Sequence, residues 1–575
     1  MAVDNAEIAR QFNMYADLLE IKGENPFRIR AYRNGARVVS SLSENVVDLI
    51  QRGVDLSSLP GIGKDLAAKI EQIVRSGRLE VLESMKEHFS PELVEFMAIV
   101  GLGGKRTAAI HSSLGVQTLE QLEKAALEHK ICKLPGFGEK IEKSILEGIQ
   151  KARVKGKRVL LKEASQIAHF YLDYLQGSEA FLQVTAAGSY RRKKESVGDL
   201  DILAICKNVS DAVEHFCSYP EVSKILSRGQ KKSSVLLRGG MQVDLRIIEK
   251  SSFGAALHYF TGSKAHNISM RRRGIRRGLK VNEYGIFRGE EKIAGEDEEE
   301  VYSALGLPWI EPELREDRGE IEAAQEQKLP VLVKRSDIRG DLHVHTNYTD
   351  GRASLEQMVE GAIRQGYSYV AITDHSKRIT IANGMDERRL RGQLERIDKL
   401  NQSLSGFTIL KGIEVDILED GSLDLPDSVL KELDIVVCSV HSRFNLSSDK
   451  QTERIKRAME NRYFNIFAHP TGRLINRREP YLYDHNQIFI TAGQRGCFLE
   501  VNSSPDRLDA TDSMCHRARE AGVRFSVSTD AHAQGDYDNI GLGIGQARRG
   551  WLEASDVINT LSVGELKRIL SEARL

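Results

Sequence analysis

The spacing of apolar and polar residues divides the chain into three parts. In residues 1–150 the apolar positions lie three or four apart, as in Ile8 and Phe12, which predicts amphipathic helices. Residues 183–248 contain apolar runs with period two, which predicts strands. Beyond residue 339, seven short apolar runs alternate with helical stretches, which predicts a repeating strand–helix order. The length of 575 residues fits several domains.

Three aspartates in the middle part lie on strand patterns. Asp199 and Asp201 are two apart within an apolar run, so a strand would point both carboxylates to one face. Asp244 lies in a second strand pattern, in a hairpin expected to turn at Gly239–Gly240. Three carboxylates on neighbouring strands can hold two Mg²⁺ ions about 4 Å apart, which suits in-line phosphoryl transfer. An Asp-x-Asp pair alone is more often a solvated surface strand, so the whole set carries the prediction.

Phosphate-binding groups surround these aspartates in the sequence. Gly188 and Ser189 offer backbone N–H groups and a hydroxyl, and Arg192 offers a cation. Residues 259–267 then read Tyr-Phe-Thr-Gly-Ser-Lys-Ala-His-Asn. Together with the three aspartates, this segment resembles the nucleotidyltransferase core of the family X DNA polymerases, the DNA polymerase beta group.

The resemblance implies specific roles. It implies that Asp199, Asp201 and Asp244 are catalytic and hold two Mg²⁺ ions, and that the backbone at Tyr259 bars a ribose 2′-hydroxyl. It assigns nucleotide contacts to Gly188, Ser189, Arg192, Gly198, Tyr259, Phe260, Gly262 and Asn267. It assigns DNA contacts in this part of the chain to Arg246, Arg271 and Glu283, within and around a dense basic run at 271–280.

Glycine-x-glycine turns followed by helices recur in residues 1–150. The three glycine pairs are Gly61 and Gly63, Gly101 and Gly103, and Gly136 and Gly138. This is the helix–hairpin–helix pattern, whose backbone N–H groups at a helix N-terminus can bind a DNA phosphate without reading sequence. The third copy has Glu142 where the pattern has a small residue.

Lys69 follows the first glycine pair. In the beta-type polymerases this region also carries a deoxyribose-phosphate lyase, and Lys69 matches the position of its nucleophile. A Schiff-base lysine needs a lowered pKa, whereas Asp65, one turn earlier, would raise it. Lys69 is therefore either a lyase nucleophile or a lysine that contacts phosphate.

Histidines and carboxylates follow most of the apolar runs beyond residue 339. Polar residues at the C-terminal ends of parallel strands are the active-site layout of a TIM-like barrel. The set resembles the PHP domain (polymerase and histidinol phosphatase), a seven-stranded barrel with up to three metal ions. Its nine ligand positions correspond to His343, His345, Asp350, His375, Glu414, His441, His469, Asp530 and His532. Mixed imidazole and carboxylate ligands suit Zn²⁺, Mn²⁺ or Fe.

Two other features in this part have less direct interpretations. Arg473 either contacts a phosphate or lies on the surface. The run Gly541–Gly545 lacks the acidic partner of a dinucleotide site and is predicted to be a loop.

Composition and charge narrow the range of expected partners and cell compartments. The formal net charge is zero, so only local basic runs point to nucleic acid, and a solvated charged face is their alternative. The six cysteines are scattered without a Cys-x-x-Cys pair, which predicts reduced thiols and a cytoplasmic protein. No apolar stretch predicts a signal sequence or a membrane span.

The expected fold is multidomain, with an N-terminal all-α helix–hairpin–helix region, an α/β nucleotidyltransferase palm with a small thumb, and a C-terminal distorted seven-stranded TIM-like (β/α) barrel. The expected boundaries are 1–85 for a lyase-like DNA-binding domain, 86–150 for helix–hairpin–helix fingers, 151–258 for the palm, 259–316 for a nucleotide-selecting subdomain, 317–338 for a linker, and 339–575 for the PHP barrel.

The expected function is a DNA-directed DNA polymerase that fills short gaps in DNA repair and uses Mg²⁺, gapped or primed DNA and dNTPs. The barrel is expected to be a 3′–5′ exonuclease or phosphoesterase that processes 3′ ends with Mn²⁺ or Zn²⁺; an abasic site is another candidate substrate. We expect a monomer with no membrane partner. One alternative is a PHP phosphoesterase whose polymerase core only binds DNA, and another is a non-catalytic DNA-binding scaffold. The complete metal-ligand sets count against both.

Overall fold

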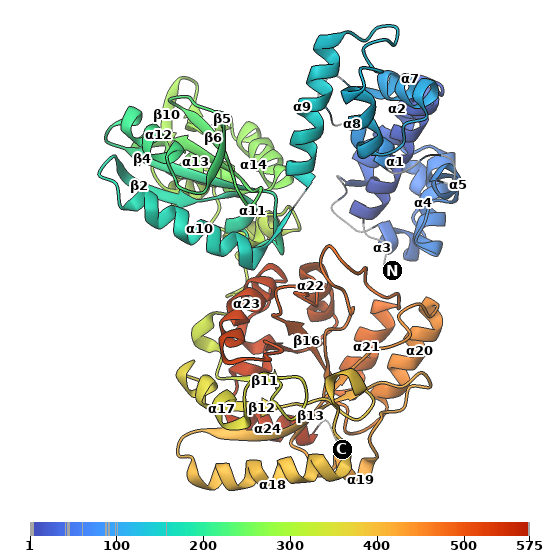
Figure 1. Cartoon of the computed structure of the whole chain (residues 1–575), viewed down its shortest axis with the longest axis vertical. Helices are drawn as coiled ribbons and strands as arrows, with labels where there is room; N and C mark the ends of the chain where they lie inside the picture. The colour runs from blue at the N-terminus through green and yellow to red at the C-terminus, as the bar shows by residue number, and fades with distance from the viewer. Residues whose placement is uncertain are drawn as a thin grey trace. The chain divides into compact units, whose positions relative to one another are not determined.

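The computed structural model describes residues 5–40, 42, 46–59, 61–86, 89, 92–97, 99, 102–156 and 158–572. The chain divides into two compact units, Met1–Lys157 and Arg158–Leu575 (Figure 1). None of the helices in the described ranges combines the length and apolar character needed to span a membrane.

The described residues of the first unit are helical, as their apolar spacing predicts. The helices are α1 (Asn5–Lys22), α2 (Pro26–Ser40), α3 (Val46–Gln51), α4 (Lys64–Ser76), α5 (Glu80–Lys86), α6 (Glu92–Phe96), α7 (Gly104–Leu114), α8 (Leu119–Leu127) and α9 (Glu139–Gly156). They pack around one apolar core that includes Phe12, Tyr32 and Ile70.

The glycine-x-glycine turns lead directly into helices. Gly63 is the N-cap of α4 and Gly103 the N-cap of α7. Gly61 and Gly136 have φ of 93° and 82°, a backbone conformation that side chains with a Cβ rarely adopt. The predicted phosphate-contacting position Gly101 lies outside the described residues.

In the third copy, Glu142 is buried and bonded within the turn. Its carboxylate accepts a hydrogen bond from the Cys132 backbone N–H at 2.9 Å and contacts His129 Nδ1 at 2.7 Å. The carboxylate therefore provides hydrogen-bond partners for the segment that precedes α9. The fold accommodates the Glu142 side chain at a position where the helix–hairpin–helix pattern has a small residue.

The second unit begins with a mixed five-stranded sheet, the palm. Its strands are β2 (Phe181–Ala186), β4 (Asp199–Cys206), β5 (Val222–Ser227), β6 (Lys232–Leu237) and β7 (Gln242–Ile247), in the order β2-β4-β7-β6-β5. The short strands β1 (Val159–Leu160) and β3 (Ser196–Val197) form a separate pair. The helices are α10 (Leu161–Gln176), α11 (Gly188–Arg191) and α12 (Val209–Cys217). The predicted hairpin is confirmed, since β6 and β7 pair antiparallel.

The thumb follows the palm. It contains α13 (Phe253–Thr261), α14 (Lys264–Arg276) and α15 (Glu298–Ala304), with a sheet of β8 (Lys280–Asn282), β9 (Gly285–Arg288) and β10 (Glu291–Ala294). Residues 317–338, expected as a linker, contain α16 (Glu320–Gln325), and Ile321 and Ala324 belong to the thumb core. Trp551 of the barrel joins the same core, so this segment is packed against both neighbours.

Seven parallel strands form the C-terminal barrel, in sequence order. They are β11 (Gly340–Val344), β12 (Tyr369–Ile372), β13 (Thr408–Asp416), β14 (Ile435–Ser439), β15 (Ile466–Phe467), β16 (Phe498–Asn502) and β17 (Phe525–Ser528). A parallel bridge between Val344 and Ala531 brings the last strand back to the first. The predicted seven-stranded TIM-like barrel is confirmed.

Helices follow each strand of the barrel and cover it (Figure 1). They are α17 (Leu355–Arg364), α18 (Glu387–Ser403), α19 (Asp427–Leu430), α20 (Ser448–Met459), α21 (His485–Arg495), α22 (Asp512–Glu520), α23 (Ile540–Arg549) and α24 (Val563–Glu572). Helices α17 to α22 connect successive strands, and α23 and α24 follow β17. The loop predicted at Gly541–Gly545 is wrong, because these glycines lie in α23. A Cβ at Gly545 would lie 3.1 Å from the Lys193 side chain of the palm, so the missing side chains let this helix approach its neighbours closely.

Candidate active sites: a carboxylate cluster and a histidine cluster

The palm brings two of the predicted aspartates into direct register. Strands β4 and β7 run parallel, and Asp201 lies opposite Asp244. Asp199 precedes Asp201 by two positions on the same strand, so its carboxylate is on the same face. Asp244 is buried, whereas Asp199 is exposed. The three carboxylates thus line one end of the sheet, with one side open to solvent.

The electrostatics of this cluster reflect mutual repulsion. Burial, followed by the charges of Asp199 and Asp244, raises the pKa of Asp201 to about 7. Burial also opposes ionisation of Asp244, but hydrogen bonds led by Lys232 lower its pKa, with Lys232 Nζ 2.7 Å from Asp244 Oδ2. Three convergent carboxylates fit oxygen-preferring divalent ions such as Mg²⁺.

The glycine that precedes the acidic strand is sterically required. Gly188 has φ of 67°, and a Cβ there would lie 2.7 Å from Asp201 Oδ2. Ser189 and Arg192 line a pocket of about 480 Å³ next to it. Arg192 is held by Glu316, at 2.9 Å from Nε, and by the carbonyl of Thr261. At Gly198 a Cβ would lie 3.3 Å from the Arg158 guanidinium.

The predicted nucleotide-selecting residues hold one another in place. Asn267 Nδ2 donates to the carbonyl of Tyr259 at 2.7 Å and to that of Gly262 at 3.3 Å. The Arg246 guanidinium lies 4.1 Å from the centre of the Phe260 ring. Asn267 therefore holds the backbone of residues 259–262 in place.

The two remaining predicted DNA contacts lie close by in the thumb. Arg271 is exposed on α14 and donates to the Tyr259 hydroxyl at 3.0 Å. Glu283 lies in the turn between β8 and β9.

Lys69 is paired with a carboxylate in the first unit. Its ammonium group contacts Asp65 one turn earlier on α4. Burial would lower the pKa of Lys69, but the hydrogen bond to Asp65 and the neighbouring Tyr32 raise it overall. A raised pKa leaves less of the free amine that Schiff-base chemistry needs.

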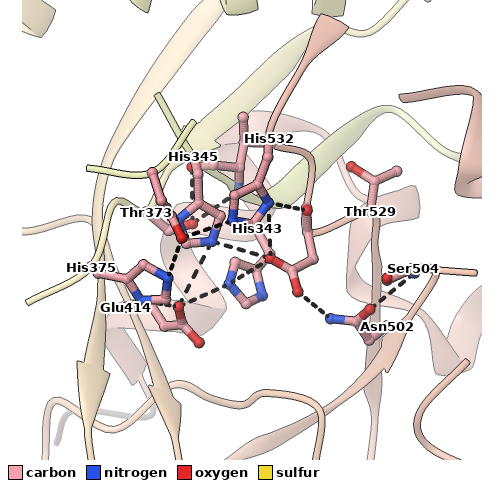
Figure 2. A network of polar contacts seen from close by, with 12 residues as sticks. His343, His345, Thr373, His375, Glu414, Asn502, Ser504, Thr529 and His532 are labelled. Atoms are coloured by element: carbon pink, nitrogen blue, oxygen red, sulfur yellow. Dashed lines mark hydrogen bonds and ion pairs between the residues drawn. The ribbon is translucent and has the colours of Figure 1, made fainter. Parts of the chain in front are cut away.

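All nine predicted ligand positions of the barrel come together at the C-terminal ends of its strands. Figure 2 shows His343, His345, His375, His532 and Glu414 pointing toward one another. Three groups of potential ligand atoms, each within 4.8 Å, occur in this cluster. They are His345, Asp350, His375 and His532; His343, His345 and Asp530; and His375, Glu414 and His441.

Carboxylates lie between the histidines. Glu414 Oε2 is 2.7 Å from His375 Nδ1, and its other oxygen is 3.0 Å from His469 Nε2. Asp530 Oδ1 is 3.2 Å from His345 Nε2. Since neighbouring groups share His345 and His375, the cluster is one continuous site with room for more than one ion.

Unsatisfied buried atoms test whether this cluster fits a metal. The buried ring nitrogens without a hydrogen-bond partner among the described residues include His343 Nε2, His345 Nδ1, His441 Nδ1 and His469 Nδ1. Buried polar atoms normally have partners, so unpaired ring nitrogens around one centre fit a site that can hold cations. Two ligands, His469 and Asp530, also have positive φ of 28° and 55°, which is uncommon for non-glycine residues and clusters at functional sites.

The histidines of this cluster have widely different pKa values in the absence of metal. Burial, followed by the charges of His532 and His375, lowers the pKa of His345 to about 3. Burial opposes protonation of His375, but Glu414 and Asp350 raise its pKa to about 10. Asp350 and Asp530 similarly raise the pKa of His532 to about 9. The raised pKa of His375 and His532 favours their protonated forms, with which a metal ion would have to compete.

A second layer of carboxylates orients the ligands. Glu500 on β16 is fully buried; it contacts His343 Nδ1 at 2.7 Å and accepts from the His469 backbone N–H at 2.7 Å. Asp416 accepts from the His441 backbone N–H at 3.1 Å. The ligand set from the sequence omitted both residues. Asp416 follows Glu414 by two positions on one strand, so period-two spacing could have identified it.

Arg473 is neither on the surface nor at the metal cluster. Its guanidinium donates to Glu195 of the palm at 2.7 Å and to the carbonyl of Arg507 at 2.9 Å. It joins the barrel to the palm.

Comparison with known proteins agrees with this geometry. The chain matches family models described as a helix-hairpin-helix domain (3–79), a SAM-like helix-hairpin-helix tandem (94–151), DNA polymerase beta palm (158–254), DNA polymerase beta thumb (256–316) and PHP domain (341–504). It is 36% identical, over 98% of its length and 99% of the relative's, to the DNA polymerase/3′-5′ exonuclease PolX of Bacillus subtilis (strain 168). The chain belongs to the PolX family.

Other relatives cover separate parts of this PolX-family chain. A probable phosphatase of Thermoanaerobacter sp. (strain X514) is 30% identical over 41% of the chain and 95% of the relative. DNA polymerase lambda of Rattus norvegicus is 25% identical over 54% of the chain and 56% of the relative. The PHP match ends before Asp530 and His532, which the last strand nevertheless brings into the cluster.

Proposed function

We propose that this chain is a DNA polymerase that fills short gaps and trims 3′ ends with a separate metal centre. The register of Asp201 against Asp244 carries the polymerase assignment, because it places carboxylates from adjacent strands at one point. The PolX relative, named as a polymerase and exonuclease, supports both activities.

In the palm, Asp199, Asp201 and Asp244 would hold two Mg²⁺ ions, which when bound supply charge neutralisation at the reacting phosphate. Ser189 and Arg192 would hold the triphosphate tail, because both line the adjoining pocket. The Tyr259 backbone, held by Asn267, would exclude a ribose 2′-hydroxyl. Gly61, Gly63 and Gly103 would present backbone N–H groups to DNA phosphates.

The barrel would hold Mn²⁺ or Zn²⁺ with its histidines, as mixed imidazole and carboxylate ligands favour. Such ions when bound lower the pKa of coordinated water and polarise a phosphodiester. Glu500 would keep His343 in the ligating orientation. The substrate proposed is the 3′ end of DNA, with phosphomonoesters second, because the Thermoanaerobacter relative is named a probable phosphatase.

For Lys69 we favour contact with DNA phosphate over lyase chemistry. Its ion pair with Asp65 and its raised pKa support this choice. Trapping with borohydride on a DNA carrying a 5′-deoxyribose phosphate tests it, and a covalent adduct lost in Lys69→Ala would establish the lyase instead.

Two assays on one metal-stripped preparation test the main proposal. Incorporation of a labelled dNTP into a gapped duplex should return with Mg²⁺, and digestion of a labelled 3′ end should return with Mn²⁺ or Zn²⁺. Absence of incorporation under every metal, with digestion intact, would favour the alternative in which the polymerase core only binds DNA.

A further inference from the structure

A group of potential metal ligands lies in the first unit, outside both active sites. It consists of His129, Cys132 and Glu142, whose ligand atoms all lie within 4.8 Å of one another. The first two residues lie in the segment between α8 and α9, and Glu142 lies in the first turn of α9. The group therefore combines an imidazole, a thiol and a carboxylate, the three ligand types that Zn²⁺ uses in proteins.

Glu142 forms the buried floor of this group. Its side chain is 3% exposed, and one oxygen accepts a hydrogen bond from the Cys132 backbone N–H at 2.9 Å. That bond leaves the other oxygen facing the imidazole, 2.7 Å from His129 Nδ1. Burial opposes ionisation of Glu142, but the bonds to Cys132 and His129 lower its pKa. The carboxylate is therefore held in place and charged, as a metal ligand must be.

His129 and Cys132 approach this carboxylate from the solvent side. His129 is mostly exposed and has φ of 52°, a conformation that is uncommon for a residue with a side chain. The Cys132 thiol donates to the His129 carbonyl at 3.4 Å. Partial burial, followed by the negative charge of Glu142, raises the pKa of Cys132. A divalent cation between the thiol and the carboxylate would remove that repulsion and favour the thiolate.

The ligand types select the class of cation. Mg²⁺ and Ca²⁺ prefer oxygen ligands, whereas thiolate and imidazole favour Zn²⁺ and related ions. Bonds from Zn²⁺ to these ligands are about 2.0–2.3 Å long, so donor atoms this close to one another can reach a single ion with small side-chain movements.

We propose that His129, Cys132 and Glu142 form a structural site for Zn²⁺, separate from the palm and barrel centres. Three protein ligands leave the fourth tetrahedral position for water. The ion ties the segment before the third glycine-x-glycine turn to the start of α9, and so braces the turn that contains Gly136 and Gly138. This site depends on neither the polymerase nor the nuclease assignment.

Cobalt titration of the full-length, reduced and metal-stripped protein tests the site. Co²⁺ substitutes for Zn²⁺, and a thiolate ligand gives it a sulfur-to-cobalt charge-transfer band in the near ultraviolet. None of the nine barrel ligands is a cysteine, so cobalt bound there does not contribute to this band. We expect the band in wild type and its loss in Cys132→Ser. The matched control is Cys206→Ser on β4, which changes the other cysteine that is only partly buried and should keep the band.

A second variant covers the case in which Cys132→Ser fails to fold, which circular dichroism shows. His129→Asn changes an exposed side chain, and asparagine also tolerates positive φ, so the backbone should be unchanged. We expect it to bind Co²⁺ at least about tenfold more weakly, with His169→Asn, an exposed histidine on α10, as the control. The site is overturned if wild type shows no thiolate band, if Cys132→Ser keeps it, or if it saturates only above about 1 mM Co²⁺.

Amide hydrogen exchange tests the bracing role. Zn²⁺ should slow exchange in residues 129–142 of wild type and leave it unchanged in Cys132→Ser, because the ion removes local opening of this segment. Equal exchange with and without Zn²⁺ in wild type would overturn the structural role.

Discussion

The palm cluster gathers three carboxylates with one side open, whereas the barrel cluster gathers histidines and carboxylates that are mostly buried. In the palm, protein cations stand beside the acids: Lys232 Nζ lies 2.7 Å from Asp244, and Arg246 Nε lies 3.9 Å from Asp201. In the barrel, many ligand atoms have no hydrogen-bond partner.

This difference suggests that metal ions enter the palm together with the substrate, whereas the barrel keeps its metal ions bound between reactions. Carboxylates balanced by nearby lysine and arginine can exist without metal at modest cost, and Mg²⁺ usually comes bound to substrate phosphates. Orphaned imidazoles in a buried cluster are costly without metal. We therefore expect the barrel to retain its ions through purification and the palm to exchange them with each nucleotide.

The sharpest separation of the two centres is expected from Asp244→Ala. Loss of this carboxylate should lower nucleotide incorporation at least about a thousandfold, because it removes several kcal/mol of transition-state stabilisation. Digestion of 3′ ends should remain near wild type. Gap-filling and exonuclease rates measured on one preparation check this, with Asp211→Ala on α12 as a surface control. Incorporation within about tenfold of wild type would contradict the palm assignment.

The reciprocal experiment removes His343 and His345 together. The double substitution to Ala takes away two imidazoles that lie in neighbouring ligand groups, so we expect loss of bound transition metal and at least about a hundredfold loss of 3′–5′ digestion. Polymerisation should survive, because the palm aspartates are separate from these ligands.

Metal analysis, both activities and a thermal melt are measured together. The control is His516→Ala, a barrel histidine on α22 that lies outside the ligand groups. Full digestion after complete metal loss would assign the nuclease activity to another source.

A smaller effect is expected from Glu500→Gln. The substitution keeps the shape but removes the charge that faces His343 Nδ1, so metal affinity should fall about 10–100-fold. Competition with a chelator measures this affinity, and Glu460→Gln on the exposed barrel surface serves as the control. If affinity stays at the wild-type level, Glu500 supports the fold rather than the metal.

Local periodicity was enough to place the candidate ligands on strands, whereas their assignment as two metal-ligand sets rested on the family resemblances. Period two placed Asp199 and Asp201 on one face, and the apolar run before each histidine marked a strand end. Period-two spacing from Glu414 could have identified Asp416 of the second layer. The role of Glu500 could not be predicted, because its contact with His469 depends on β16 lying beside the strand that leads to His469.

Long-range packing explains the two segments that differ from expectation. The polar composition of residues 317–338 suggested a linker, yet Ile321 packs into the thumb core, and Glu320, buried, contacts His266 at 2.6 Å. The glycines of α23 suggested a loop, but they permit close approach to the palm at Lys193. Neither contact has a signal in neighbouring residues.

The last prediction compares the pH dependence of metal binding at the two centres. In the palm, Asp201 has a metal-free pKa of about 7, so below that pH a proton competes with Mg²⁺ and the apparent affinity should fall by up to about tenfold per pH unit. Above it, Asp201 is ionised and Asp244, whose pKa is lowered, is already charged, so affinity should level off. The Mg²⁺ concentration that gives half-maximal incorporation, measured from about pH 6 to 9, reports this.

In the barrel the same competition extends to higher pH. His375 and His532 have metal-free pKa values of about 10 and about 9, so each must lose a proton before its nitrogen can bind an ion. Affinity for Mn²⁺ or Zn²⁺, measured against a chelator of known pH dependence, should therefore keep rising between about pH 7 and 9, where the palm is level. Parallel curves for the two centres would show that the neighbouring carboxylates do not keep His375 and His532 protonated, and the electrostatic contrast between the sites would be lost.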